Sequence, residues 1–152
     1  MSHELSPALS TAAILSETRF FGDLSAAQIE RVAGLAQIEE RADGAPVYRT
    51  GEPAVDMYVL VRGQVRMTVG FRARNTNAGD LLRRGEVFGW AALTPACNLR
   101  VANATCLAPC RLLVINGEQL LALMEQDHTI GYRLTTQLTR LITGTLAAFA
   151  GG

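Results

Sequence analysis

The residues most able to do chemistry are three cysteines in one region of the chain, Cys97, Cys106 and Cys110. Cys106 and Cys110 flank a short Leu-Ala-Pro segment, a spacing that could serve a metal or a redox pair. A tetrahedral zinc site needs further ligands, and only His3 and His128 remain besides Cys97, scattered along the chain. We therefore expect Cys106 and Cys110 to be reduced, buried and free of metal.

The sequence carries no motif of a known catalytic centre. It contains no GxSxG, HExxH or GxGxxG, and no acid and base stand at a useful spacing. All 14 basic residues are arginine, which excludes a P-loop and a lysine Schiff base, because both need the ammonium group. We expect a protein that is not an enzyme.

Composition favours one compact domain. The chain has 152 residues, of which 49% are hydrophobic and 18% charged, enough to bury a core. The net charge is +0, so nothing favours a nucleic-acid partner. The start, MSHELSPALSTAAIL, lacks the cationic region of a signal peptide, and no apolar segment is long enough to cross a membrane. These features predict a cytoplasmic protein without a membrane partner.

Helices are predicted at both ends of the chain. At the start, helices are expected over about residues 12–38, where Ser25-Ala-Ala-Gln28 fits a capping box. Apolar residues at helical spacing follow it, namely Ile29, Val32, Leu35 and Ala36. At the end, a short helix over 118–125 precedes a longer one over about 129–149.

The middle of the chain, about residues 45–115, reads as a block of short strands. Apolar residues alternate on either side of Gly63: Met57, Val59 and Val61, then Val65, Met67, Val69 and Phe71. Two more strands are expected over 102–107 and 111–115, joined across Ala108-Pro109. Short strands separated by glycine-centred turns predict a sandwich or roll.

Three stretches of this block resemble the cyclic-nucleotide-binding domain of catabolite-activator-like regulators: GEPAVDMYVLVRGQVRM, RRGEVFGWAAL and LRVANATCLAPCRLLVI. The similarity extends over about residues 14–149. It implies an eight-stranded β-roll with flanking helices, a mainly β member of the α+β class. It also implies a pocket for a cyclic nucleotide, the phosphate-binding cassette.

The resemblance assigns the cassette to residues Gly89, Trp90, Ala91, Ala92, Leu93, Arg100, Val101 and Ala102. In the family, the free amides of a short helix and one arginine hold the phosphate, and here Arg100 has that arginine's usual spacing from Gly89. Two family contacts are missing. Trp90 stands where a glutamate accepts from the ribose hydroxyl, and Val101 stands where a Ser or Thr contacts the phosphate.

These two departures leave the ligand open. Each lost contact desolvates a ligand group without a partner, so tight binding of cAMP or cGMP is not expected. Arg100 is expected either to meet an anion, a ligand or a carboxylate such as Glu86, or to be a solvated surface group. Trp90 is expected to fill the core rather than to stack on a ligand.

The last helix is the expected contact with another chain. Residues 141–152, LITGTLAAFAGG, carry no charge, and Leu134, Leu138, Leu141 and Phe149 form one apolar face. The corresponding helix of related regulators pairs with its twin, so we expect a homodimer or a different protein subunit on this face. Packing of the face on the chain's own roll is the alternative.

The functional expectation is a non-catalytic sensory or regulatory module that acts through a protein partner. One alternative is a genuine cyclic-nucleotide receptor with a variant cassette, and another is a structural subunit of a larger complex. The related regulators carry a helix-turn-helix domain after the long helix, whereas this sequence ends at Ala150-Gly-Gly. No DNA binding by this chain is therefore expected.

Overall fold

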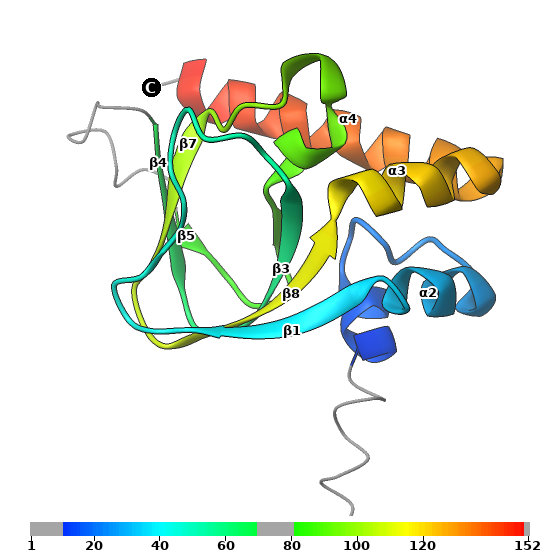
Figure 1. The fold of residues 1–152 in the computed structure, drawn as a ribbon, viewed down its shortest axis with the longest axis horizontal. Coiled ribbons are helices and arrows are strands. Elements are labelled where there is room, and N and C mark those ends of the chain that lie inside the picture. The colour runs from blue at the N-terminus through cyan, green and yellow to red at the C-terminus, as the bar shows by residue number, and fades with distance from the viewer. Residues whose placement is uncertain (1–10, 70–80, 151–152) are drawn as a thin grey trace, which may run out of the picture.

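The computed structural model describes residues 11–69 and 81–150, without the side chains of residue 69 and of residues 146–150. Within these residues the chain forms eight strands in two antiparallel sheets, with helices before and after them (Figure 1). The expected β-roll is confirmed. No helix in the described part of the chain is long and apolar enough to cross a bilayer.

The first sheet has the order β1-β8-β3-β6. Its strands are β1 (Ala36–Arg41), β3 (Asp56–Arg62), β6 (Val87–Phe88) and β8 (Cys110–Asn116). The second sheet has the order β2-β7-β4-β5. Its strands are β2 (Pro46–Tyr48), β4 (Val65–Val69), β5 (Leu81–Leu82) and β7 (Ala102–Cys106).

One boundary expected from the sequence is wrong. Residues 36–38 were assigned to an N-terminal helix, but the helix α2 spans Ala26–Ala33 and Ala36 begins β1. The main-chain N–H of Gly34 caps α2, and the next residues pair with β8, from Ala36 opposite Ile115 to Arg41 opposite Cys110. Pairing with a distant strand therefore overrides the local helical spacing.

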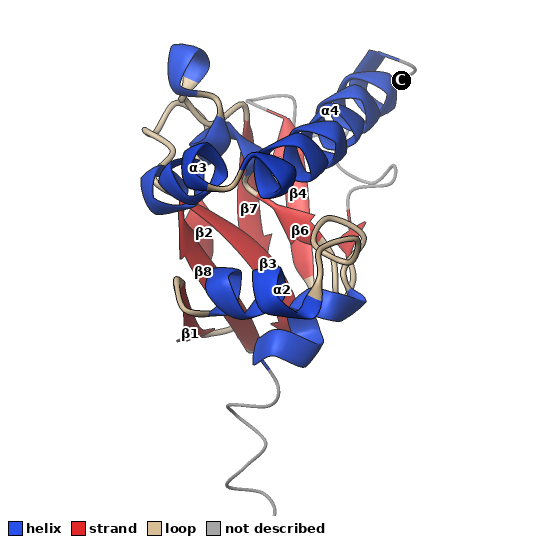
Figure 2. Cartoon of the chain, turned by 90° about the vertical axis from the view of Figure 1, so that its right-hand side faces the viewer, coloured by secondary structure: helices blue, strands red, loops and turns tan. Residues whose placement is uncertain are grey.

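The other helices match the expectation. The capping box at Ser25 is present, with Gln28 N–H donating to Ser25 Oγ and Ser25 N–H donating to Gln28 Oε1. After β8 come α3 (Gly117–Gln126) and α4 (His128–Ala150), close to the predicted bounds. In Figure 2 both helices lie at one end of the strands, and α2 lies in front of the first sheet.

Strand β3 divides two apolar clusters. Met57 and Val59 face the larger cluster, which the helices cover, whereas Tyr58 and Leu60 face the smaller cluster inside the roll. Because alternate residues of a strand point to opposite faces, one buried strand supplies both cores. The expected alternation of Met57 and Val59 is confirmed, while Phe71 lies outside the described residues.

Candidate functional site

The turn that leads into the cassette depends on two glycines. Gly85 and Gly89 have φ values of 90° and 84°, a left-handed conformation that glycine adopts at little cost. A Cβ at Gly89 would also lie 3.1 Å from the Tyr58 ring and 3.2 Å from Arg100 Nη1. Gly89 then caps the short 3-10 helix η2 (Trp90–Leu93). The turn therefore presents its backbone directly to Arg100.

Arg100 is buried at the cassette, with 4% of its surface exposed, so it is not a solvated surface group. Its Nη1 donates to the main-chain oxygen of Gly89 at 3.0 Å, and its Nη2 donates to the main-chain oxygen of Asp56 at 2.6 Å. The guanidinium also stacks on Tyr48, with Cζ 4.0 Å from the ring centre. Arg100 therefore ties β2, β3 and the cassette turn together.

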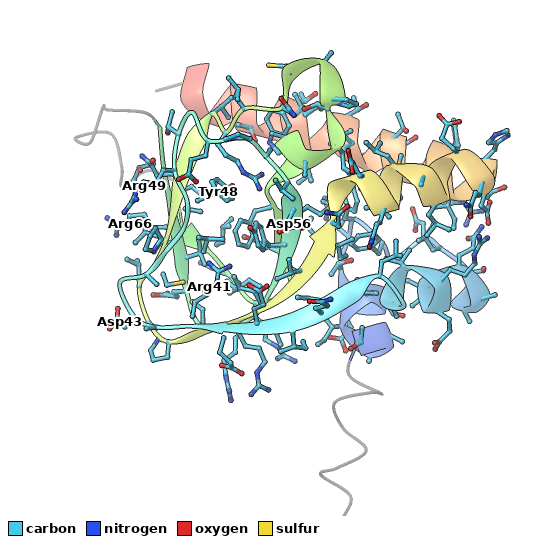
Figure 3. All side chains as sticks on the ribbon, viewed as in Figure 1. Arg41, Asp43, Tyr48, Arg49, Asp56 and Arg66 are labelled. Atoms are coloured by element: carbon cyan, nitrogen blue, oxygen red, sulfur yellow. The ribbon has the colours of Figure 1, made fainter. Side chains whose placement is uncertain are left out.

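Glu86, proposed as a carboxylate partner of Arg100, makes a different contact. Its Oε1 accepts a hydrogen bond from the main-chain N–H of Arg83 at 3.1 Å. The carboxylate whose pKa responds to Arg100 is Asp56. Burial raises that pKa and Glu39 adds to the rise, while Arg100 opposes it. Burial likewise raises the pKa of Tyr48, again opposed by Arg100. Figure 3 shows Tyr48 and Arg41 pointing between the two sheets.

Trp90 joins the cassette to α4. Its indole is half-buried and packs against the larger apolar cluster. The indole Nε1 donates to Thr145 Oγ1 at 3.3 Å, and Thr145 Oγ1 donates to the main-chain oxygen of Leu141 at 3.0 Å. Trp90 thus packs on the core as expected, but it also lines an open cavity.

The cavity has a volume of about 660 Å³ and lies between the roll and α4. Of the eight candidate cassette residues, all line it except Ala92 and Leu93, which pack in the core. Val101, at the Ser/Thr position of the family, is 45% exposed and presents methyl groups. The volume of the cavity lies in the usual range of small-molecule sites, roughly 300–1,000 Å³.

Sequence reasoning missed the far wall of this cavity. Arg19 and Phe20 contribute from the segment before α2, and α4 contributes Gln137, Arg140, Leu141, Gly144 and Thr145. The α4 residues recur at intervals of three and four, so they share one helical face. This spacing is present in the sequence, but an apolar pattern alone selects only the leucines of α4.

A family model for the cyclic nucleotide-binding domain matches residues 38–127, more than half of the chain. The chain belongs to this family. A relative from Rhodopseudomonas palustris, provisionally named a potassium channel protein, is 28% identical over 123 residues. That match covers 80% of this chain and 29% of the relative, so the chain spans less than a third of that protein.

Solved structures share the fold of this cyclic nucleotide-binding domain. The sensor domain of the transcriptional regulator DNR from Pseudomonas aeruginosa superposes with a TM-score of 0.74 at 19% identity, covering 93% of this chain and 94% of that one. The catabolite activator protein of Thermus thermophilus has a TM-score of 0.66 at 22% identity, covering 83% and 59%. Identities this low show the fold alone.

The thiols lie away from the cavity. Cys106 and Cys110 are buried in the cluster inside the roll, and Cys97 is exposed; none forms a disulfide. Burial, together with the neighbouring Cys110 thiol, raises the pKa of Cys106 to about 12, which makes it a poor nucleophile. No cluster of metal-binding side chains occurs in residues 11–69 and 81–150. His3 lies outside those ranges.

The apolar face of α4 turns mainly toward the chain's own core. Leu134 is fully buried there, and Leu138 and Leu141 pack against the same cluster half-buried. Leu134 is therefore not available to another chain, which corrects that part of the interface prediction. The side chain of Phe149 is outside the described part, and contact of α4 with a partner stays a prediction.

Proposed function

We propose that this cyclic nucleotide-binding domain is a non-catalytic sensory module whose cavity binds a small ligand and whose α4 passes the signal to a protein partner. One observation carries the proposal. The cavity is bounded on one side by the cassette and on the other by one face of α4. Any occupant would contact both elements and would favour the α4 position that fits it best.

The named relatives are consistent with a sensory role. One similar structure is the sensor domain of a transcriptional regulator, and the curated relative is provisionally named a potassium channel protein. The first is part of a transcriptional regulator, and the second matches this chain over 29% of its length. We propose a corresponding role here, with a protein partner receiving the signal.

We further propose that the ligand is not a tightly bound cAMP or cGMP. Two of the five N–H groups of Arg100 already donate to main-chain oxygens, and its buried Nε has no partner, so a phosphate could use only the N–H groups that these two bonds leave open. Trp90 offers no acceptor to a ribose hydroxyl, and Val101 offers no hydroxyl donor to a phosphate oxygen. Each unsatisfied polar group costs about 1–3 kcal/mol, so the two losses weaken binding by roughly a hundredfold or more.

A genuine cyclic-nucleotide receptor is the second candidate. Two observations favour it: Arg100 lies at the cassette, and Trp90 leaves the cavity of about 660 Å³ open. Titration calorimetry with cAMP and with cGMP distinguishes the two candidates. We expect no binding in the micromolar range, and a micromolar dissociation constant for either nucleotide would establish the receptor instead.

Restoring the missing groups sharpens the test. The double variant Trp90→Glu, Val101→Ser should bind cAMP more tightly than the parent, because it regains an acceptor and a hydroxyl. The matched control is Trp90→Met, Val101→Ala, which reduces both side chains by a similar amount without adding a carboxylate or a hydroxyl. Equal affinities of the two double variants would show that these contacts do not limit binding.

A further inference from the structure

We propose that the cavity beneath α4 takes a small aromatic acid, with its acid group held by Arg19 and Arg140 and its polar edge by Gln137. This inference rests on the proposed sensory function, because it names the ligand class for the same cavity. It moves the anion site from the cassette arginine to the opposite wall.

The charges available to a ligand lie on that wall. Arg19, before α2, and Arg140, on α4, both line the cavity and have exposed side chains. Neither makes a hydrogen bond or an ion pair with another residue of the described part. Arg100, by contrast, is buried and both of its Nη atoms donate to main-chain oxygens, although its Nε has no partner. Among the described lining residues, Glu86 carries the one carboxylate, so the lining has an excess of positive charge.

Gln137 offers a ligand a further polar group beside these arginines. Its side chain is 94% buried (6% exposed), lines the cavity and makes no hydrogen bond within the described residues. Its amide atoms are not among the fully buried atoms that lack a partner, so they are open to the cavity and available to an occupant. Gln137 precedes Arg140 by one turn on the same face of α4. A ligand acid group held by Arg140 would therefore lie close to this amide.

The remaining walls favour an aromatic body over a ribose. They are formed by apolar side chains, among them Phe20, Met67, Leu82, Phe88, Leu141 and Val101. Trp90 is held in place by its bond to Thr145 and offers a ring for stacking. Sugar hydroxyls would be desolvated against these walls, whereas an aromatic ring gains from burial there.

The test uses Trp90, the single Trp of the chain, as a reporter inside the cavity. The probes are the aromatic sulfonate 1-anilinonaphthalene-8-sulfonate and its neutral counterpart N-phenyl-1-naphthylamine. Energy transfer from Trp90 to each probe gives its dissociation constant in the full chain. We expect the sulfonate to bind about a hundredfold more tightly than the neutral probe, as two charged hydrogen-bonding contacts predict.

Variants locate the acid group. Arg19→Gln and Arg140→Gln should each weaken sulfonate binding by about tenfold and leave the neutral probe unchanged. Gln137→Met should weaken sulfonate binding and leave binding of the neutral probe unchanged, because it removes the polar group at nearly constant size; a residue with only a structural role would affect both probes alike. Arg62→Gln is the matched control, because Arg62 is exposed and does not line the cavity.

Three results would overturn the inference, two of them against the acid class and one against the cavity. If both probes bind equally in every variant, or if Arg62→Gln weakens the sulfonate as much as Arg140→Gln, the acid class is wrong while the sensory cavity stands. If neither probe accepts energy from Trp90, the ligand cavity of the proposed function is wrong as well. Thermal melts of every variant establish that the compared proteins are folded.

Discussion

The guanidinium of Arg100 stacks on the ring of Tyr48, with its Cζ 4.0 Å from the ring centre. Both residues are buried, at 4% and 7% exposure, so the contact is shielded from water. A desolvated contact of this type is worth about 2 kcal/mol. The same guanidinium donates to the main-chain oxygens of Gly89 and Asp56. Arg100 is therefore a structural tie between the roll and the cassette turn.

We predict that Arg100→Met lowers the free energy of unfolding by about 1–3 kcal/mol, because the oxygens of Gly89 and Asp56 lose a charged donor. Urea denaturation measures this difference. The control Arg62→Met changes an exposed arginine of β3 and should stay within about 0.5 kcal/mol of the parent. An unchanged stability of Arg100→Met would mean that the arginine serves a ligand and not the fold.

The sequence predicted the position of Arg100 in the fold, but it did not predict the hydrogen-bond partners of that residue. Turn glycines and strand alternation predict a sandwich or roll, and the family resemblance, through the spacing from Gly89, places the arginine at the cassette. Its partners could not be predicted, because they are main-chain oxygens of Gly89 and Asp56, and any residue type supplies such an oxygen. The strand β1 was missed for a similar reason. Its pairing with β8 depends on a segment that follows it by more than sixty residues.

The second prediction concerns the bond between Trp90 and Thr145. Thr145→Val removes the acceptor at nearly constant size and should lower the free energy of unfolding by about 0.5–1.5 kcal/mol. It should also shift the emission of Trp90, since the indole N–H loses its partner. Trp90→Phe and the double variant complete a double-mutant cycle. A coupling energy near zero would show that the bond does not hold α4 to the cassette.

The third prediction concerns pH and Asp56. Burial, with Glu39 adding to the effect, raises the pKa of Asp56 in the folded state above its unfolded value. The folded state therefore binds this proton more tightly, and the associated stability is present at low pH and lost as pH rises through the folded pKa. Asp56→Asn removes this loss and keeps the main-chain oxygen that Arg100 needs.

Urea midpoints measured from about pH 3 to about pH 7 check this linkage. The urea midpoint of Asp56→Asn should rise relative to that of the parent as pH rises. Glu30→Gln, a change at an exposed carboxyl of α2, controls for the loss of one acidic group. A midpoint of Asp56→Asn that rises relative to the parent as pH falls would be opposite to this prediction, and it would contradict a pKa of Asp56 raised by burial.

The last prediction concerns the outer face of α4, since Leu134 is taken up by the chain's own core. The exposed residues there include Tyr132, which is 75% exposed, with Thr135, Thr136, Thr139 and Thr143. The hydroxyls of Thr136 and Thr139 donate to main-chain oxygens of α4 itself, so methyl groups and one ring are left for a partner. An exposed helix of a monomer normally has charged residues on its outer face, whereas these residues carry no charge.

We predict that the outer face of α4 packs against a second copy or another subunit, and that the full chain is a dimer unless its natural partner is present. Light scattering gives the mass. Tyr132→Glu and Thr139→Glu should each shift the chain toward monomer, because a dimer would bury the added charge without a partner. Ala27→Glu places the same charge on the exposed side of α2 and should leave the mass unchanged. A monomeric parent that recovers no partner from its host would contradict the prediction, and dissociation by Ala27→Glu would place the contact elsewhere.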